Sequence, residues 1–432
     1  MQRNALLDEL AWRGLLYQNT DGLSELLDQG SVSGYVGFDP TARSLHVGNL
    51  IPVMGLTHLQ RHGHRPIMLV GGGTGLIGDP SGRSAERQLI TADVVEENVR
   101  GIRSQLERFL DFSGPQAARM RNNADWLVPL RAIDFMRDVG KHFTVNYMMA
   151  KESVKSRLEG GISYTEFSYM LLQAYDYLEL YRREGVRLQM GGSDQWGNIT
   201  AGAELIRRSA GGEAHGLTLP LVTTSAGTKF GKTAAGAVWL DPAQTSPYRF
   251  WQFWINTDDS DVGKYLRYFT LLSEQTIEGL ERALADHPER REAQVALANE
   301  VTGRVHGAEA ARVAAEVSGV LFGGTQPTSL SLQAIEALRA EMPFTELQVP
   351  DGSSIAGTDQ AGIDVLEVFV SARLTASKGA ARRLLEQGGL YVNGQRLSAT
   401  DRRLGDDRLL PGDHLLLRKG AKDYALVRLR RS

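Results

Sequence analysis

The stretch YVGFDPTARSLHVGNL, residues 35–50, places polar side chains where a short β-like run gives way to a helix. Asp39 ends the run, and His46 and Gly48 lie where the helix should begin, with Asn49 as its N-cap. Free N–H groups and the positive end of the helix dipole attract phosphate at such a point. The glycine permits close approach and the imidazole adds a donor. This pattern predicts a phosphate site, although a capped helix with a surface histidine would look the same.

A glycine-rich turn follows the next β-like run, in the sequence GGGTGLIGDPSG. Its glycines satisfy the dinucleotide pattern G-x-G-x-x-G, but Asp79 and Pro80 follow at once and interrupt any helix. A Walker loop is excluded because an aspartate follows the last glycine. The turn is better suited to presenting Asp79 into a cleft.

Tyr169, Gln173 and Asp176 share one face of an expected helix over residues 164–181, because they are spaced by four and three positions. The rest of that helix is largely apolar. A polar stripe of this kind commonly faces solvent. Carboxylate, amide and phenol together could equally bind a small polar ligand.

The segment QMGGSDQWGN, residues 189–198, follows another strand-like run. Gly192 allows a ligand close to the backbone, while Asp194 offers an acceptor and Gln195 an amide. An acidic residue at this point suits ribose hydroxyls. A glycine turn before a capped helix is the alternative interpretation.

The segment GTKFGKT places Lys229 and Lys232 between two glycines. Such a loop can fold over a triphosphate and offset charge that develops in a transition state. Taken alone, it could be a solvated cationic turn.

These motifs lie on alternating β-like and helical patterns over the first 240 residues, which predicts an α/β domain with a mostly parallel sheet. The strand candidates are YVGF, RPIMLVGG, RLQMGG and LPLVTT; the helix candidates are LIPVMGLTHLQRHG and YTEFSYMLLQAYDYLELYRREG. Residues 245–322 look helical, with capping residues such as Ser273 and Thr276. Gly, Pro and Ser then surround a short helical piece, 329–342. We therefore expect domains at 1–244, 245–325 and 363–432, with a linker at 326–362.

The C-terminal segment 363–432 carries a net charge of +6, from 14 Lys and Arg against 8 Asp and Glu, so the rest of the chain carries −9. A basic module on an acidic body suggests a polyanionic partner, although a solvated basic face remains an alternative.

The composition excludes some classes of protein. The 432 residues contain no cysteine, which rules out disulfides, zinc thiolates and cysteine nucleophiles and fits a cytoplasmic protein. No segment approaches the ~18 apolar residues of a membrane span. The N-terminus resembles an amphipathic helix, not a signal peptide.

The ordered set GFDPTARSLHVGN, GLIGDPSG, FSYMLLQAYD, GGSDQWGNI and KFGKT resembles the bacterial tyrosyl-tRNA synthetases, a family of class I aminoacyl-tRNA synthetases. The resemblance extends along essentially the whole chain. It implies a Rossmann-like catalytic domain, an α-helical anticodon-binding domain and a small α+β, S4-like RNA-binding domain. It also implies a homodimer that activates L-tyrosine with ATP and Mg²⁺ and charges tRNA(Tyr), with no protein-bound cofactor.

The resemblance assigns roles to individual residues. Those implied to bind tyrosine are Tyr35 and Asp176 at the phenol hydroxyl, and Tyr169, Gln173 and Asp79 at the amino group. Those implied to meet the nucleotide are Asp39, Gly48, Gly192 and Asp194, with Thr41 and His46 at the phosphates. Gln195 would lie near the reacting carboxylate. The mobile loop stabilising pyrophosphate would carry Lys229, Lys232 and Thr233, and RNA would meet Lys378, Arg382 and Arg383.

Two positions depart from the class pattern. Asn49 stands where the signature has a second histidine, so we expect altered nucleotide contacts with activity retained. The lysine loop reads KFGKT, which suits the tyrosyl branch but lacks the serine of the general class I motif.

Other functions remain open at this point. A tryptophanyl-tRNA synthetase is the nearest, and the pair Tyr35 and Asp176 argues against it because it suits a phenol. A nucleotidyltransferase with the same phosphate site would leave the basic module unexplained. A non-enzymatic RNA-binding protein would not need the lysines and His46, and an NAD-dependent oxidoreductase is more distant still.

Overall fold

The computed structural model describes residues 4–79, 90–155, 160–225, 227, 230–233, 236–322, 325–349, 363–405 and 408–431. The chain forms two compact units. The first comprises residues 1–246 and 253–305, and the second residues 247–252 and 306–432. Within the described ranges, no helix is long and apolar enough to cross a membrane.

A six-stranded sheet forms the centre of the first unit, in the order β1-β6-β5-β2-β3-β4. The strands are β1 (Gln18–Asn19), β2 (Ser33–Phe38), β3 (Arg65–Val70), β4 (Arg119–Asn122), β5 (Leu188–Gly192) and β6 (His215–Leu219). All neighbours pair in parallel except β1, which is antiparallel to β6. This confirms the expected mostly parallel sheet. The chain leaves β2 for β3 on one side, while β5 lies on the other, and ligands bind at the carboxyl ends beside such a switch point.

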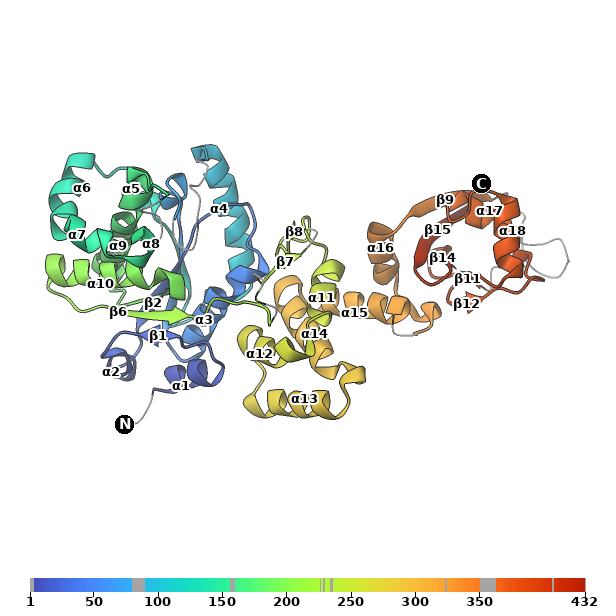
Figure 1. Ribbon diagram of the computed structural model, residues 1–432, viewed down its shortest axis with the longest axis horizontal. Helices are drawn as coiled ribbons and strands as arrows, with labels where there is room; N and C mark the ends of the chain where they lie inside the picture. Colours follow the sequence, from blue (N-terminus) through green and yellow to red (C-terminus); the bar gives the residue numbers. More distant parts are fainter. Residues whose placement is uncertain are drawn as a thin grey trace. The chain divides into compact units, whose positions relative to one another are not determined.

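Helices cover both faces of this sheet (Figure 1). On one face lie α9 (Tyr164–Glu184) and α10 (Trp196–Ala210), which pack on inward side chains such as Tyr35 and Ile67. On the other lies α3 (Leu50–Arg61), where Gly55 permits close packing because a Cβ there would lie 2.8 Å from Leu219.

The predicted helices correspond closely to α3 and α9, and three of the four strand candidates correspond to β2, β3 and β5. The fourth strand prediction is wrong in position. The candidate LPLVTT was expected over 219–224, but β6 ends at Leu219 because Pro220 has no N–H to extend the ladder.

Further helices complete the first unit. They are α1 (Ala5–Trp12), α2 (Leu23–Asp28), α4 (Ala92–Leu106), α5 (Ala124–Leu127), α6 (Ala132–Asp138), α7 (Val145–Met149), α8 (Glu152–Lys155), α12 (Asp259–Phe269), α13 (Glu274–Asp286) and α14 (Glu292–His306). The helix α14 belongs to the first unit except for its last residue, His306, which belongs to the second. The helix α11 (Pro247–Ile255) is also divided between the two units, after residue 252.

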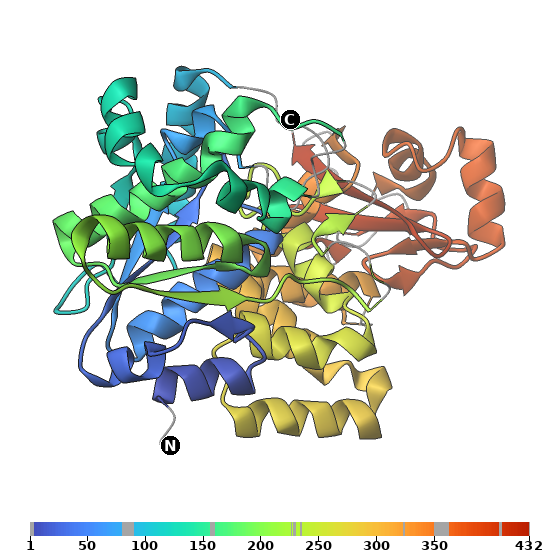
Figure 2. The ribbon, with the colours of Figure 1, turned by 60° about the vertical axis from the view of Figure 1, so that its left-hand side comes forward.

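In Figure 2, α1 (blue) lies close to α12 and α13 (yellow). The buried Arg13, the residue after α1, holds the end of α12. The Arg13 guanidinium donates to the carbonyls of Arg267, Thr270 and Leu272 and so satisfies groups that the helix leaves unpaired. Ser273 then caps α13, as expected. Thr276 lies inside the first turn and gives its N–H to Ser273, so it does not cap the helix itself.

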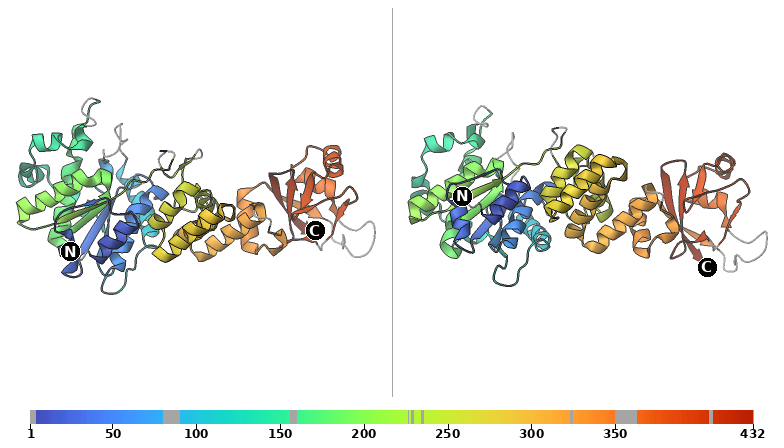
Figure 3. Two further views of the ribbon diagram at one scale, coloured as in Figure 1. Left: turned by 60° about the horizontal axis from the view of Figure 1, so that its bottom comes forward. Right: turned by 90° about the horizontal axis from the view of Figure 1, so that it is seen from below.

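The second unit is built on a five-stranded sheet in the order β12-β11-β14-β15-β9. The strands are β9 (Phe344–Val349), β11 (Leu390–Val392), β12 (Gln395–Arg396), β14 (His414–Lys419) and β15 (Asp423–Arg431). One face carries α15 (Ala308–Phe322) and α16 (Leu332–Glu341), and the other carries α17 (Val365–Ser371) and α18 (Lys378–Glu386) (Figure 3). The helix α16 fulfils the expectation for 329–342. The strand β9 lies in the segment 326–362 and pairs in parallel with β15, which the sequence did not indicate.

Candidate active site

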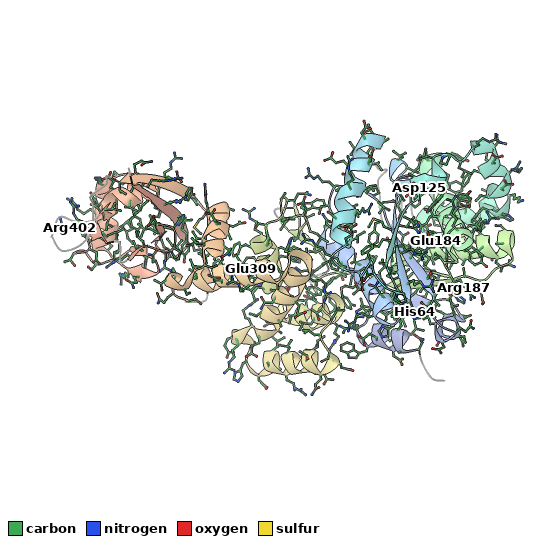
Figure 4. The ribbon with its side chains drawn as sticks, turned by 180° about the vertical axis from the view of Figure 1, so that it is seen from behind. His64, Asp125, Glu184, Arg187, Glu309 and Arg402 are labelled. Carbon is green, nitrogen blue, oxygen red and sulfur yellow. The ribbon has the colours of Figure 1, made fainter. Side chains whose placement is uncertain are left out.

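A cavity of about 260 Å³ opens at the carboxyl ends of β2, β3 and β5. In Figure 4, His64 and Arg187, which precede β3 and β5, mark the opposite, amino ends of these strands. The predicted site residues that line the cavity are Tyr35, Asp39, Thr41, His46, Asn49, Asp79, Tyr169, Gln173, Asp176, Gly192 and Gln195. The sequence motifs therefore converge on one site. Gly48 and Asp194 adjoin these residues without lining the cavity, and Lys229 and the side chains of Lys232 and Thr233 lie outside the described part.

Tyr35 lies in the cavity wall, at the middle of β2. Its side chain is 1% exposed, and its ring meets Tyr177 edge-on with centroids 5.3 Å apart. Burial, and after it the nearby Asp176 carboxyl, raises the pKa of Tyr35 well above its ordinary value. Its hydroxyl has no hydrogen-bond partner among the described residues. A buried hydroxyl in this state is ready to bond a polar ligand atom.

Asp176, on α9, is almost fully buried beside Tyr35. Its two carboxylate oxygens accept from Asn123 Nδ2 at 2.9 Å and from Trp126 Nε1 at 2.7 Å. Burial raises the pKa of Asp176 to about 7, against the opposing effect of these two hydrogen bonds. The sequence did not reveal Asn123 and Trp126, because they belong to no motif. The only signal was their place directly after β4, at the same edge of the sheet.

A chain of hydrogen bonds leads from Asp176 to Asp39. Asn123 Nδ2 also donates to Thr74 Oγ1 at 2.9 Å, and the Thr74 hydroxyl donates to Asp39 Oδ1 at 2.8 Å. The Tyr169 hydroxyl donates to Asp39 Oδ2 at 2.9 Å. Burial, followed by the Asp39 carboxylate, raises the pKa of Tyr169 well above its ordinary value. The phenols of the cavity are therefore neutral.

A second group of polar side chains lies on the β5 side. Gln195 Nε2 donates to Asp79 Oδ2 at 2.8 Å, and Gln195 Oε1 accepts from Gln173 at 3.3 Å and from Asn198 at 3.2 Å. Asn198, third residue of α10, lies within a quoted motif but was not singled out from the sequence.

The turn before α3 is held by a reciprocal pair of side chains. His46 Nδ1 accepts from the Gly48 N–H, and Asn49 Oδ1 accepts from the His46 N–H, each at 3.0 Å. Asn49 is the N-cap residue of α3, as expected, but its side chain bonds back to His46 and makes no capping hydrogen bond to α3. With Nδ1 accepting, the imidazole proton resides on Nε2. His46 can then act as a hydrogen-bond donor, as phosphate binding requires.

The lysine loop is anchored next to this turn by its described residues. Phe230 stacks on Phe269 with centroids 5.2 Å apart, inside a cluster of further aromatic rings from α11 and α12. The Val238 N–H donates to Gly231 O, and the Val47 N–H donates to Val238 O. Gly231 has φ +80°, and a Cβ there would lie 2.6 Å from Val47, so this position requires glycine.

In the second unit, the predicted RNA-binding residues lie on α18. Arg382 and Arg383 are exposed. Lys378 Nζ pairs with Asp364 at 3.1 Å and with Glu367 at 3.3 Å, and these bonds raise the pKa of Lys378. The helix therefore presents two arginines to solvent and holds its lysine in an ion-pair network.

Comparison with known proteins agrees with this geometry. Residues 27–323 match the family model of class I tRNA synthetases (W and Y), and residues 340–427 match the tyrosine--tRNA ligase SYY-like C-terminal domain. The tyrosine--tRNA ligase of Anaeromyxobacter dehalogenans is 52% identical over 98% of this chain and 99% of its own length. That of Geobacillus stearothermophilus is 53% identical over the same shares. A truncated mitochondrial tyrosyl-tRNA synthetase from Aspergillus nidulans superposes with a TM-score of 0.68 at 30% identity, covering 74% of this chain and 95% of its own.

The Rossmann-like sheet with its His46 turn defines a class I tRNA synthetase. Within that class, the full-length similarity shows that the chain belongs to the tyrosine--tRNA ligases, which are aminoacyl-tRNA ligases.

Proposed function

We propose that the cavity binds L-tyrosine and ATP together, forms tyrosyl-adenylate and pyrophosphate, and passes tyrosine to the 3′ end of tRNA(Tyr). The observation that carries this proposal is the unpartnered Tyr35 hydroxyl near the buried Asp176 carboxyl. A phenol hydroxyl can donate to the carboxylate and accept from Tyr35, which satisfies both groups.

The remaining contacts of tyrosine follow from the two polar groups of the cavity. The ammonium group would lie among Tyr169, Gln173 and Asp79, where a phenol, an amide and a carboxyl side chain line the cavity. Gln195 Nε2 would approach the tyrosine carboxylate. An indole ring has no hydroxyl, so tryptophan would leave Tyr35 and Asp176 without their partner.

ATP, entering with Mg²⁺ as a substrate, would extend from this point toward the start of α3. The Asp39, Gly192 and Asp194 positions suit the nucleoside, and Thr41, His46 and Gly48 suit the phosphates. Asn49 acts on the nucleotide through His46, whose backbone N–H it holds. This indirect role is compatible with an asparagine in place of the second signature histidine.

The reaction needs no nucleophile from the protein, because the tyrosine carboxylate itself attacks the α-phosphate and pyrophosphate leaves. The protein's part is to align the two substrates and to stabilise charge on the phosphates. His46 Nε2 supplies one donor, and Lys229, Lys232 and Thr233 would supply others from the loop anchored by Phe230.

ATP–pyrophosphate exchange, run with each standard amino acid, tests the proposal. We expect exchange with tyrosine alone. Exchange with tryptophan would show that the enzyme is specific for tryptophan instead. No exchange with any amino acid would overturn the proposal that the chain activates an amino acid.

Recognition of tRNA would use the second unit, through Arg382 and Arg383, and the helices between residues 245 and 325 as an anticodon-binding region. We assign the chain to the cytoplasm, where its substrates are found. The sequence has no cysteine, which fits this compartment because cytoplasmic proteins rarely depend on disulfides.

A homodimer would form through an exposed apolar surface of the first unit. The large apolar side chains directly after α5, on α6 and α7 and at the start of α9 that are more than half exposed are Val128, Ile133, Met136, Val145 and Tyr164. Exposed apolar side chains of this kind support an interface in this region. Tyr164→Asp should produce monomers in sedimentation velocity, whereas a dimer of unchanged stability would exclude this surface.

A further inference from the structure

Asn198 is buried behind the cavity, where it touches two of the residues proposed to contact substrate. Its side chain is 4% exposed and does not line the cavity. Asn198 Nδ2 donates to Gln173 Oε1 at 3.0 Å and to Gln195 Oε1 at 3.2 Å. One amide group thus binds the carbonyl oxygens of both glutamines.

The direction of these bonds determines which end of each glutamine faces which neighbour. The Asp79 carboxylate can only accept, so Gln195 must turn its Nε2 toward Asp79. The Gln195 carbonyl oxygen then points away from Asp79 and needs donors on the other side. Asn198 supplies one of them, and reversing the Gln195 amide would put its oxygen against the carboxylate and its NH₂ against the NH₂ of Asn198.

The stem of Gln195 has little freedom to escape this arrangement. A Cβ on Gly191 would lie 3.1 Å from Gln195 Cβ and 3.4 Å from Ile199 Cδ1, so β5 and the start of α10 are already in close contact. The rotation of the terminal amide is therefore the main freedom that Gln195 retains, and Asn198 and Asp79 restrain it from opposite ends.

From this geometry we infer that Asn198 is a positioning residue for amino-acid activation, acting through Gln195 and Gln173. It keeps the Gln195 N–H groups directed at Asp79 and the cavity, where the substrate carboxylate reacts. This inference rests on the proposed function, because it takes the cavity to hold the carboxylate. A carbonyl oxygen in that place would repel both the carboxylate and the α-phosphate.

The test compares Asn198→Asp and Asn198→Ala with wild type in tyrosine-dependent ATP–pyrophosphate exchange. The introduced carboxylate keeps the shape of the side chain but offers no donor to the two carbonyl oxygens. We expect kcat/KM for tyrosine to fall about 10- to 100-fold in either variant, the range for a buried group that loses its partner. Thr200→Val, two residues along α10, is the matched control and should exchange as wild type does.

Two readouts separate positioning from general loosening of the fold. Protonation restores a donor to the introduced carboxyl, so the Asn198→Asp variant should recover activity relative to wild type as the pH falls from 8 to 6. In addition, Asn198→Ala should cost little in a Gln195→Ala background, because the group it positions is already gone.

Each outcome bears on the inference. Wild-type exchange with tyrosine, joined to Asn198 variants that exchange within twofold of it, would overturn the role of Asn198 while leaving the proposed function intact. Fully additive losses in the double variant, or an Asn198→Asp deficit that does not change with pH, would also overturn it. Lack of exchange by the wild-type protein would instead refute the proposed function itself.

Discussion

The cavity of the first unit and the helix α18 of the second differ in where they place their charged side chains, which are buried in the cavity and exposed on α18. In the cavity, Asp176 is 2% exposed and both its oxygens already accept hydrogen bonds. On α18, Arg382 and Arg383 lie in solvent, and Lys378 forms ion pairs with the half-buried Asp364 and the exposed Glu367. A buried group that loses its partner costs far more free energy than an exposed one. The cavity should therefore respond steeply to single substitutions, whereas α18 should respond in small, salt-dependent steps.

The largest effect is expected at Asp176. Asp176→Ala removes the acceptor of Asn123 and Trp126 and the proposed acceptor of the substrate phenol, so kcat/KM for tyrosine in pyrophosphate exchange should fall at least about 100-fold. Asp125→Ala, exposed on α5 and labelled in Figure 4, is the control and should match wild type. Unchanged tyrosine affinity in Asp176→Ala would mean that the phenol binds elsewhere.

The next effect is expected in the lysine loop. Lys232→Ala should slow adenylate formation about 10- to 100-fold in rapid-quench experiments, because it removes a charge proposed to act in the transition state. Tyrosine binding, followed by intrinsic fluorescence, should change much less. Lys141→Ala on the exposed surface is the control. Equal rates for Lys232→Ala and wild type would remove the loop from the mechanism.

A smaller and salt-dependent effect is expected on α18. Arg382→Ala and Arg383→Ala should each weaken tRNA binding several-fold and reduce the slope of log K against log salt by about 1. Lys378→Ala should do less, because Asp364 and Glu367 already balance its charge. If Lys378→Ala weakened tRNA binding more than either arginine variant, the expectation that a cation held in ion pairs contributes less than an exposed one would be contradicted.

The last effect is expected in the pH dependence of tyrosine binding. The pKa of Asp176 is raised to about 7, so the carboxylate proposed to accept from the phenol is lost as pH falls through 7. Affinity for tyrosine should rise from pH 6 to pH 8, by about tenfold at most. Asp176→Asn should abolish this dependence in calorimetric titrations. Affinity that rises toward low pH in wild type would contradict it.

The sequence predicted most of the cavity because its residues follow strand ends or helix spacing. Tyr169, Gln173 and Asp176 share one face of α9 through helical periodicity alone. Asp39 and Gln195 follow parallel strands, whose carboxyl ends must meet at one edge. These local rules account for the way in which distant segments come to line one cavity.

Other features depend on partners that no local rule identifies. Asn123 reaches Asp176 across more than fifty residues, and Asn198 acts through two side chains that it does not adjoin in sequence. The direction of the Asn49 bond depends on the extended backbone of His46. The strand β9 exists through its pairing with β15, at the far end of the chain. Tertiary contacts determine these features, so sequence periodicity could not reveal them.

A crystal structure with bound L-tyrosine tests the central claim most directly. We expect the phenol oxygen within hydrogen-bonding distance, about 2.6–3.0 Å, of both the Tyr35 hydroxyl and an Asp176 carboxylate oxygen. A phenol oxygen placed away from this pair, with the Tyr35 hydroxyl still unpartnered, would contradict it.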